Sequence, residues 1–454
     1  MGPLSDAKRR WAVLSDAIRT RLWPLPTAAV VLAVASGIGL TLLDSGIDGQ
    51  LPAAVTAYLF GGDADAARSV LSAVAGSLIT VTSLTFSLTV VTLQLASSQF
   101  SPRLLRNFSG DGFVQGTLAL FLATFAYALT VLRTVRNAGS GPVEFVPQLS
   151  VTLAYLLAVA SVLALVLFLA HLVREIRVET MVRNVHTQAR GTLLRVLPEL
   201  DGDAPAVTVP VPAAGAAPIT ARTSGFLTEI DEQRLLAAAV DAGAVVLVDR
   251  SPGSSLVADT PFGFCWPLDP VDRLGADVVA RLQDGVAGAV STGFERTDVQ
   301  DVGYGLRQLT DVATKALSPG INDPTTAVHT LGHSAALLCE MAQRDLGPAM
   351  LRDEQDSVRV VLYRSDLPGL LELAVEQPRR YGAPDRAVLA RLFWLLRELA
   401  WVTRMPAHRQ AVADQLARLR ATVAEQDFDG AERAELATLG SYVQAALDRR
   451  WPPS

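Results

Sequence analysis

The sequence predicts an α-helical integral membrane protein, with about four transmembrane helices followed by a cytosolic α+β subdomain and a mainly helical C-terminal region. Three observations support this fold class. The 454-residue chain is 50% apolar with a mean hydropathy of +0.32 and is only 19% charged, whereas a soluble domain carries about 25% charged residues. Four long apolar segments lie within the first 175 residues. The remainder has the mixed polar and apolar composition of a water-soluble region.

The four apolar segments are each long enough to cross a hydrocarbon core about 30 Å thick, which requires about 20 helical residues. None of them contains Asp, Glu, Lys or Arg. Positive charges accumulate on the cytoplasmic side of a membrane. Lys8 and Arg9 precede the first segment and Arg174 and Arg177 follow the last, so we expect a multi-pass plasma-membrane protein with both termini in the cytoplasm. The predicted spans are residues 25–43, 71–95, 113–132 and 149–172, within a transmembrane domain of residues 1–180.

The second span carries small polar side chains along one stripe. At 100° per residue the members of this stripe fall within about one quarter of the helix circumference. The helix is expected to continue to about Gln99, because Pro102 disfavours helix in the residue before it. A second polar line lies roughly opposite, formed by Thr82, Thr85, Thr89 and Thr92. The pore-lining candidates on the first stripe are Ser72, Gly76, Thr80, Ser83, Ser87, Gln94 and Ser98.

Two interpretations of this stripe are open at this point. Hydroxyl and amide groups can replace part of an ion's hydration shell, so the stripe can line a hydrated path in a homo-oligomer. Small residues also let helix backbones approach, and their hydroxyls can bond carbonyls of the same or a neighbouring helix. The absence of Asp, Glu, Lys and Arg from the spans argues against a proton relay or a charge-coupled carrier.

The chain after the last span divides into three predicted regions. Residues 181–224 should form a helix, to about residue 196, and then a Pro/Ala-rich linker with extended chain. Residues 225–270 should form a small α+β cytosolic subdomain with strands GFLTEI, AVVLVD and SLVA. Asp231 occupies the N-cap position of the helix after the first of these strands. Residues 271–454 are expected to form a helical cytosolic domain.

One motif in the helical region has the sequence GLRQLTDVATKALSPGINDPTTAV. SPGINDP separates two helices, with Asp323 at the N-cap and Pro324 at the first helical position of the second. A helix N-terminus can bind an anion, so the motif is either an anion site or a well-capped helix–turn–helix. Its candidate residues are Arg307, Gln308, Asp311, Ser318, Pro319, Gly320, Asn322, Asp323, Thr325 and Thr326.

Catalytic and metal chemistry is not indicated. His329 and His333 lie one helical turn apart with Glu340 beyond them, but an HxxxH pair without the general-base glutamate of HExxH is no hydrolase signature, and we predict no metal. Cys265 and Cys339 lie far apart, outside any zinc-type spacing. No Walker-type loop, GxSxG or GxGxxG motif occurs, so we expect neither an enzyme nor a cofactor. The net charge of -6 argues against nucleic acid as a partner.

Two segments, SLITVTSLTFSLTVVTLQLASSQFSPRLLRNF and GLRQLTDVATKALSPGINDPTTAV, resemble signature stretches of the DUF2254 family, bacterial membrane proteins of uncharacterised function. GFLTEIDEQRLL and DLPGLLELAVEQPRRYG are similar to further family segments, so the resemblance covers most of residues 71–382. The segment SPGSSLVADTPFG departs from the RPGDFV-type turn of the family. The resemblance implies a multi-span inner-membrane protein with a cytosolic tail, and it brings no activity, cofactor or substrate.

Two functional hypotheses follow from these observations. The first is a homo-oligomeric plasma-membrane channel for an ion or small solute, lined by the second span and gated by the cytosolic domain. The alternative is a membrane-anchored sensor or scaffold that binds a partner protein or an anionic ligand through its cytosolic helices. The size of the cytosolic half favours this alternative, because a simple pore does not require it. The expected partners are the lipid bilayer and further copies of the chain.

Overall fold

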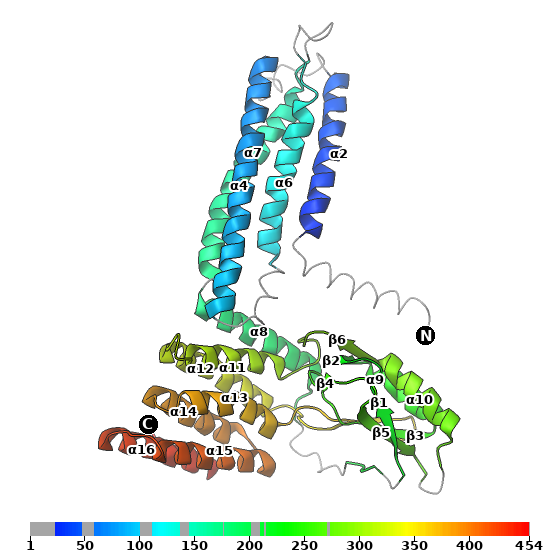
Figure 1. Ribbon diagram of the computed structural model, residues 1–454, viewed down its shortest axis with the longest axis vertical. Coiled ribbons are helices and arrows are strands. Elements are labelled where there is room, and N and C mark those ends of the chain that lie inside the picture. The colour runs from blue at the N-terminus through cyan, green and yellow to red at the C-terminus, as the bar shows by residue number, and fades with distance from the viewer. Residues whose placement is uncertain are drawn as a thin grey trace. The chain divides into compact units, whose positions relative to one another are not determined.

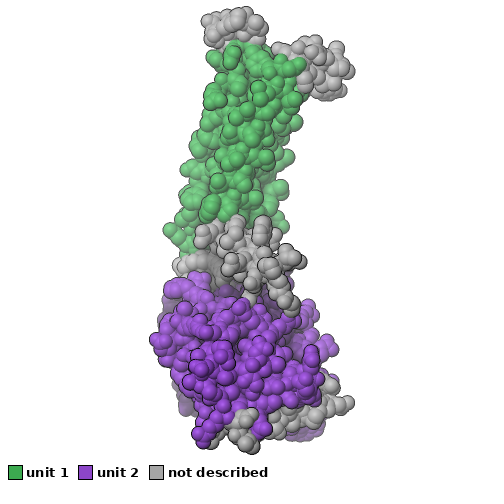
Figure 2. All heavy atoms as spheres, turned by 90° about the vertical axis from the view of Figure 1, so that its right-hand side faces the viewer, with its two compact units in different colours: residues 1–177 green, residues 178–454 purple. Residues whose placement is uncertain are grey.

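The computed structural model describes residues 23–47, 59–99, 111–136, 145–175, 177–200, 209–212, 215–269 and 273–453. The chain divides into two compact units, Met1–Arg177 (unit 1) and Val178–Ser454 (unit 2), which are coloured separately in Figure 2. Each unit has its own hydrophobic core.

Unit 1 contains four long helices, which lie side by side in Figure 1. All four are long and apolar enough to cross a membrane, which confirms the predicted number of spans. α6 packs against the other three helices, and its Phe121, Tyr127 and Ala128 are buried among them. The four helices are α2 (Pro24–Ile47), α4 (Ala64–Gln99), α6 (Gly112–Leu132) and α7 (Gln148–Glu175).

Helix α4 is longer than a bilayer core requires. Its 36 residues span about 54 Å at about 1.5 Å per residue, against a core about 30 Å thick. The prediction that this helix continues to Gln99 is confirmed. The expected break at Ser101-Pro102 and the side chain of Ser98 lie outside the described residues.

Two carboxylates hold helix ends in unit 1. Asp44 of α2 is 8% exposed and accepts hydrogen bonds from Leu149 N (3.1 Å), Ser150 N (3.0 Å) and Ser150 Oγ (2.6 Å) at the start of α7. Asp111 caps α6 through Phe113 N, and its second oxygen lies 2.6 Å from Nε2 of His171 on α7. Helix N-termini carry unpaired N–H donors, so each carboxylate ties one helix to another while satisfying these donors.

Unit 2 begins with α8 (Val178–Val196) and includes two β-sheets. The five-stranded sheet has the order β1-β5-β3-β8-β7, in which the β3–β8 pair is parallel and the other pairs are antiparallel. Helices α9 (Glu232–Asp241) and α10 (Ala276–Ala289) pack against each other and against this sheet, with Leu235 and Val286 in the shared core. The three-stranded sheet has the order β4-β2-β6. The strands are β1 (Ala217–Thr220), β2 (Gly225–Ile230), β3 (Ala244–Val248), β4 (Ser255–Leu256), β5 (Pro261–Pro267), β6 (Val290–Gly293), β7 (Ala349–Arg352) and β8 (Val358–Leu362).

The prediction that residues 271–454 are helical is wrong for β6, β7 and β8. Val360 and Val361 of β8 are fully buried beside β3, so the sheet combines segments that are remote in the sequence. These strands have four or five residues, too few to show a clear period, and a short apolar run fits a strand or a buried helix equally. SLVA was expected as a whole strand, but only Ser255–Leu256 pairs, and the Pro/Gly/aromatic segment around Cys265 is β5.

The helical part of unit 2 is a stack of helix pairs. α8 packs on α11 and α12, these pack on α13 and α14, and α15 and α16 follow (Figure 1). Aspartates cap four of these helices, including Asp323 as predicted. The helices are α11 (Tyr304–Ala316), α12 (Pro324–Met341), α13 (Leu367–Tyr381), α14 (Arg386–Val402), α15 (Pro406–Ala424) and α16 (Gly430–Leu447).

One buried arginine in this helical part is surrounded by aromatic side chains. Arg397 of α14 is 1% exposed, and its guanidinium carbon lies 3.9 Å from the ring centroid of Trp451 and 4.8 Å from those of Trp394 and Tyr442. One nitrogen donates to the carbonyl of Pro452, while Nε and Nη1 have no hydrogen-bond partner among the described residues. The ring faces therefore supply much of the electrostatic compensation for this buried cation.

Candidate functional site

The inner face of α4 carries the threonine line. Thr82, Thr85, Thr89 and Thr92 are all buried within unit 1. Three of these hydroxyls donate to carbonyls one turn back in the same helix, those of Leu78 (2.7 Å), Thr85 (2.8 Å) and Leu88 (2.9 Å). This is the arrangement expected of polar residues that pack inside a helix bundle.

The serine-rich stripe lies on the outer face of α4. All of its candidate residues with described side chains are exposed, namely Ser72, Gly76, Thr80, Ser83, Ser87 and Gln94. A Cβ added at Gly76 would meet nothing within 4 Å, so packing inside the subunit does not explain the glycine there. Apolar side chains such as Phe86 and Leu84, each 55% exposed, flank the stripe. Packing within one subunit therefore accounts for the burial of the threonine line, although the Thr85 hydroxyl has no hydrogen-bond partner among the described residues. The stripe faces away from the other described helices of unit 1, and within it the Thr80 hydroxyl donates to the carbonyl of Gly76 in the same helix at 3.2 Å.

In the SPGINDP turn, a side chain of the turn itself caps the N-terminus of α12. Asp323 accepts hydrogen bonds from Thr326 N (3.0 Å) and Thr326 Oγ1 (2.6 Å), and these bonds lower the pKa of its carboxyl. The carboxylate thus occupies the position that a bound anion would take at this helix N-terminus. Asn322 adopts a left-handed conformation (φ 49°) that turns the chain into α12.

The other candidate residues of this motif do not gather at the turn. Arg307 and Gln308 lie in the first turns of α11 and Asp311 in its middle, whereas the turn follows its last residue. Gln308 is buried in the core, and the exposed members are Pro319, Gly320, Asn322 and Thr325. Ser318 is half-buried, and its hydroxyl donates to the carbonyl of Lys315. The capped helix–turn–helix interpretation accounts for this geometry.

Three histidines meet where α8 packs on α12. The ring centroid of His333 lies 5.2 Å from that of His329 and 5.1 Å from that of His186 on α8. Glu340 lies on the same face of α12, but it pairs with Arg190 of α8 at 2.9 Å. Among the described residues, no group of three or more His, Cys, Asp and Glu side chains is arranged to hold a metal. Sequence reasoning missed His186, because nothing in its spacing connects it to α12.

We expect unit 2 to lose stability at mildly acidic pH through this cluster. Burial, then the charges of His186 and His329, lowers the pKa of His333. As the pH falls, His333 is therefore protonated in the unfolded chain at a higher pH than in the folded chain. The free energy of unfolding then decreases below a pH of about 6.5. Thermal unfolding of the full chain between pH 7.5 and 5.5 measures this slope, and His333→Gln should flatten it.

His408 provides the control for this measurement, because burial lowers its pKa as well. A His408→Gln variant reports the share of the slope that arises away from the α8–α12 contact. If His333→Gln leaves the pH slope unchanged while His408→Gln removes it, the histidine cluster is not the acid-sensitive element.

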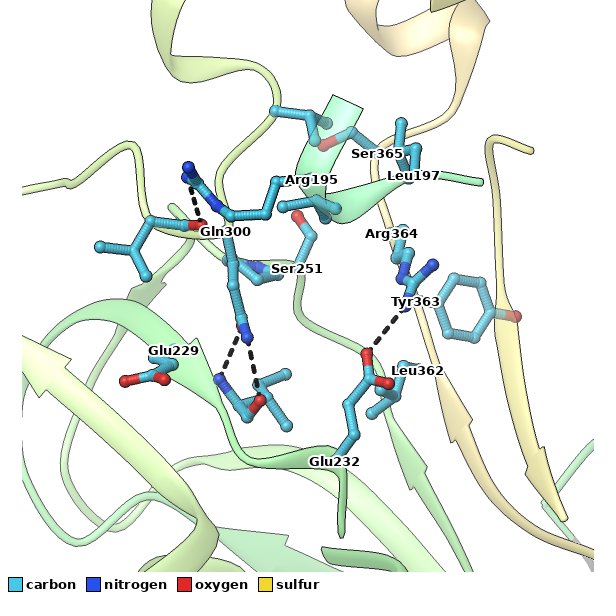
Figure 3. Close-up of a pocket in the computed structure, with 15 residues that line it drawn as sticks. Arg195, Leu197, Glu229, Glu232, Ser251, Gln300, Leu362, Tyr363, Arg364 and Ser365 are labelled. Atoms are coloured by element: carbon cyan, nitrogen blue, oxygen red, sulfur yellow. Dashed lines mark hydrogen bonds and ion pairs between the residues drawn. The ribbon is translucent and has the colours of Figure 1, made fainter. Parts of the chain in front are cut away.

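A pocket of about 380 Å³ lies within unit 2 (Figure 3). Five chain segments line it: the end of α8, the end of β2 with the start of α9, the turn after β3, the chain before α11 and the chain after β8. Its polar lining comprises Arg195, Glu229, Glu232, Ser251, Gln300, Tyr363, Arg364 and Ser365. Sequence reasoning did not find this pocket, because its walls come together only through long-range contacts.

Hydrogen bonds tie the pocket walls to one another. The Gln300 amide is bonded to both N and O of Ile230, at 2.8 and 3.1 Å, and Arg364 pairs with Glu232 at 2.8 Å. Nη2 of Arg195 donates to the carbonyls of Asp298 and Val299, at 3.2 and 3.1 Å. These bonds connect the helical part of unit 2 to its sheets.

The chain is similar to a described family and to curated proteins. The family model for a predicted membrane protein, DUF2254, matches residues 19–398. Uncharacterised proteins of Mycobacterium bovis and of two strains of Mycobacterium tuberculosis are each 35% identical to the chain over 444 residues, which are 97% of this chain and 83% of theirs. No solved structure matches the chain. On the family match and these relatives, the chain belongs to the DUF2254 family of predicted membrane proteins.

Proposed function

We propose that this membrane protein is a homo-oligomer in which the α4 helices of several copies line a pathway for ions or small polar solutes. The observation that carries the proposal is the exposure of the serine-rich stripe on the face of α4 opposite its buried threonine line. Hydrocarbon offers no hydrogen-bond partner to a hydroxyl or an amide, whereas water or another α4 does. A hydrated path between copies satisfies the stripe along its length and permits dehydrated ions to exchange ligands.

The proposal places both termini and unit 2 on the cytoplasmic side of a plasma membrane. It is supported by Arg174 and Arg177 after the last span and by the basic residues that precede the first. In this proposal unit 2 is the cytoplasmic part of the protein, and it assembles with other copies and gates the flux.

Ion flux through proteoliposomes that contain the purified protein tests the proposal. We expect the native protein to pass ions and Ser83→Trp to reduce the flux at least about tenfold, because a bulky ring on the stripe would block a path that exposed hydroxyls line. Phe86→Trp is the matched control. It places the same indole group at an exposed position of the same helix that lies off the stripe, where a smaller ring is already present, and its flux should equal that of the native protein.

A second readout checks contact between copies. Ser87→Cys, in a background where Cys265 and Cys339 are serine, should form a disulfide-linked dimer under mild oxidation, and Phe86→Cys should not. No flux from the native protein under any salt gradient or voltage, or equal flux from the Ser83 and Phe86 variants, would contradict a pathway along α4.

The sensor is the second candidate function, and the pocket in unit 2 favours it. A pocket of about 380 Å³ falls within the range of small-molecule sites, which is about 300–1,000 Å³. Ligand-binding and flux measurements on the same purified protein distinguish a sensor from a channel. Saturable ligand binding without flux supports the sensor, and flux without ligand binding supports the channel.

A further inference from the structure

We infer that the pocket in unit 2 binds a small organic anion with an apolar body. The inference rests on the charges and walls of the pocket and is independent of any flux through unit 1. Figure 3 shows Arg195 and Gln300 on one side of Ser251 and the Glu232–Arg364 pair on the other.

Arg195 supplies the cation. Its described hydrogen bonds all involve Nη2, and their acceptors are the uncharged oxygens of Thr192, Asp298 and Val299. Two carboxylates line the pocket. Glu232 pairs with Arg364, and Glu229 is engaged in an interaction of its own. Among the described ion pairs none includes Arg195. The remaining N–H groups of its planar guanidinium fit a carboxylate or phosphate in a two-pronged hydrogen bond.

Part of the pocket lining is apolar. Leu197, Ile230, Val302 and Leu362 line it, and each is at most 5% exposed. A ligand with a ring or a short hydrocarbon body would contact the apolar atoms that these side chains present to the pocket, whereas an inorganic anion bound at Arg195 would not. Burial of apolar area between ligand and protein stabilises such a complex.

The shape of the pocket is set before any ligand arrives. Gly253, in the turn that carries Ser251, has φ 90°, and a Cβ there would clash with Oδ2 of Asp301. Asp301 is buried and pairs with Arg296 at 2.6 Å, and its other oxygen accepts from Gly303 N. Both side chains of this pair lie directly against Gly253, so the chain that carries Val299 and Gln300 packs closely on the turn. A preformed site loses little conformational entropy when a ligand binds.

The end of α8, the helix that follows the four apolar helices in the sequence, forms one wall of the pocket. Arg195 lies in the last turn of α8, which begins at Val178, soon after α7 ends at Glu175 in the sequence. A ligand held by Arg195 therefore stabilises one position of α8 relative to the sheets of unit 2.

The test is equilibrium dialysis of 1-naphthyl phosphate against the full chain in lipid nanodiscs. We expect saturable binding of one probe per chain. 1-Naphthol, which lacks the anion, and inorganic phosphate, which lacks the apolar body, should each bind at least about tenfold more weakly, because both contacts contribute. Arg195→Gln should weaken the binding of 1-naphthyl phosphate by about tenfold or more, and Arg195→Lys by less, because lysine keeps the charge without the planar fork.

Arg190→Gln is the matched control, because Arg190 is an exposed arginine of the same helix whose partner, Glu340, lies outside the pocket. Its binding should equal that of the native chain. The inference is overturned if the native chain shows no saturable binding of 1-naphthyl phosphate, if 1-naphthol binds as tightly, or if Arg190→Gln weakens binding as much as Arg195→Gln. Because Arg195→Lys retains the charge and most of the side-chain volume, it keeps the test valid if Arg195→Gln fails to fold.

Discussion

Arg397→Ala is expected to lower the free energy of unfolding of unit 2 by about 3 kcal/mol. The substitution removes one of the largest fully buried side chains and leaves a cavity between three aromatic rings. It also removes cation–π attraction, which is worth about 2 kcal/mol when the cation is desolvated. Denaturant unfolding of the full chain, followed by tryptophan fluorescence, measures the loss, since Trp394 and Trp451 contact the guanidinium.

Two further variants separate packing from charge at this position. Arg397→Met fills much of the space without the charge, so its loss should be smaller than that of alanine. Arg420→Ala removes an exposed arginine whose described bond is to the Gly440 carbonyl, and should cost about 1 kcal/mol. A cost for Arg397→Ala no larger than that for Arg420→Ala would show that the aromatic cluster contributes little to stability.

Asp44→Ala is expected to destabilise unit 1 by about 3 kcal/mol. The carboxylate accepts three hydrogen bonds at the start of α7, and its removal leaves buried donors of Leu149 and Ser150 unpaired. Each unsatisfied buried donor costs about 1–3 kcal/mol, and water cannot replace the lost partner in an apolar surrounding. Thermal denaturation of the detergent-solubilised protein measures the effect, and Asp44→Asn should restore part of the loss because its side-chain oxygen still accepts.

Asp63→Ala is the matched control for Asp44. Asp63 also caps a helix, since it accepts a hydrogen bond from Ala66 N at the start of α4, but it is exposed to solvent. Its loss should cost about 1 kcal/mol, because water replaces the missing acceptor. Equal effects of the two substitutions would mean that the burial of Asp44 and its link between α2 and α7 add nothing to an ordinary cap.

The local features of the fold were predictable from the sequence. The four spans, the continuation of α4 to Gln99, and the caps at Asp231 and Asp323 all depend on residues a few positions apart. The two polar lines of α4 were also predicted to lie on opposite faces. Periodicity and capping act within one or two turns of chain, so their signals are complete in a short window of sequence.

The candidate sites were predictable only in part. Periodicity shows that α4 has two polar faces, but it carries no information on which face packs against α6. The contacts between the helices show that the threonine line is the buried face. The SPGINDP motif was recognised, but its two interpretations were separated by the position of the Asp323 carboxylate. The pocket around Arg195 gave no signal at all, since its five segments are remote in the chain.

Sequence reasoning alone was enough to predict four helices long and apolar enough to span a membrane, a polar stripe on the second and a capped helix–turn–helix motif beyond them. Four features became visible only in the folded chain: the stripe faces outward, β8 pairs with β3, His186 lies beside His333 of α12, and Arg195 and Arg364 line one pocket. The physical reason is the distance along the chain between the residues that determine each feature. Secondary structure follows from the steric and hydrogen-bonding preferences of neighbouring residues, whereas strand pairing, side-chain clusters and pockets depend on which distant surfaces bury each other best.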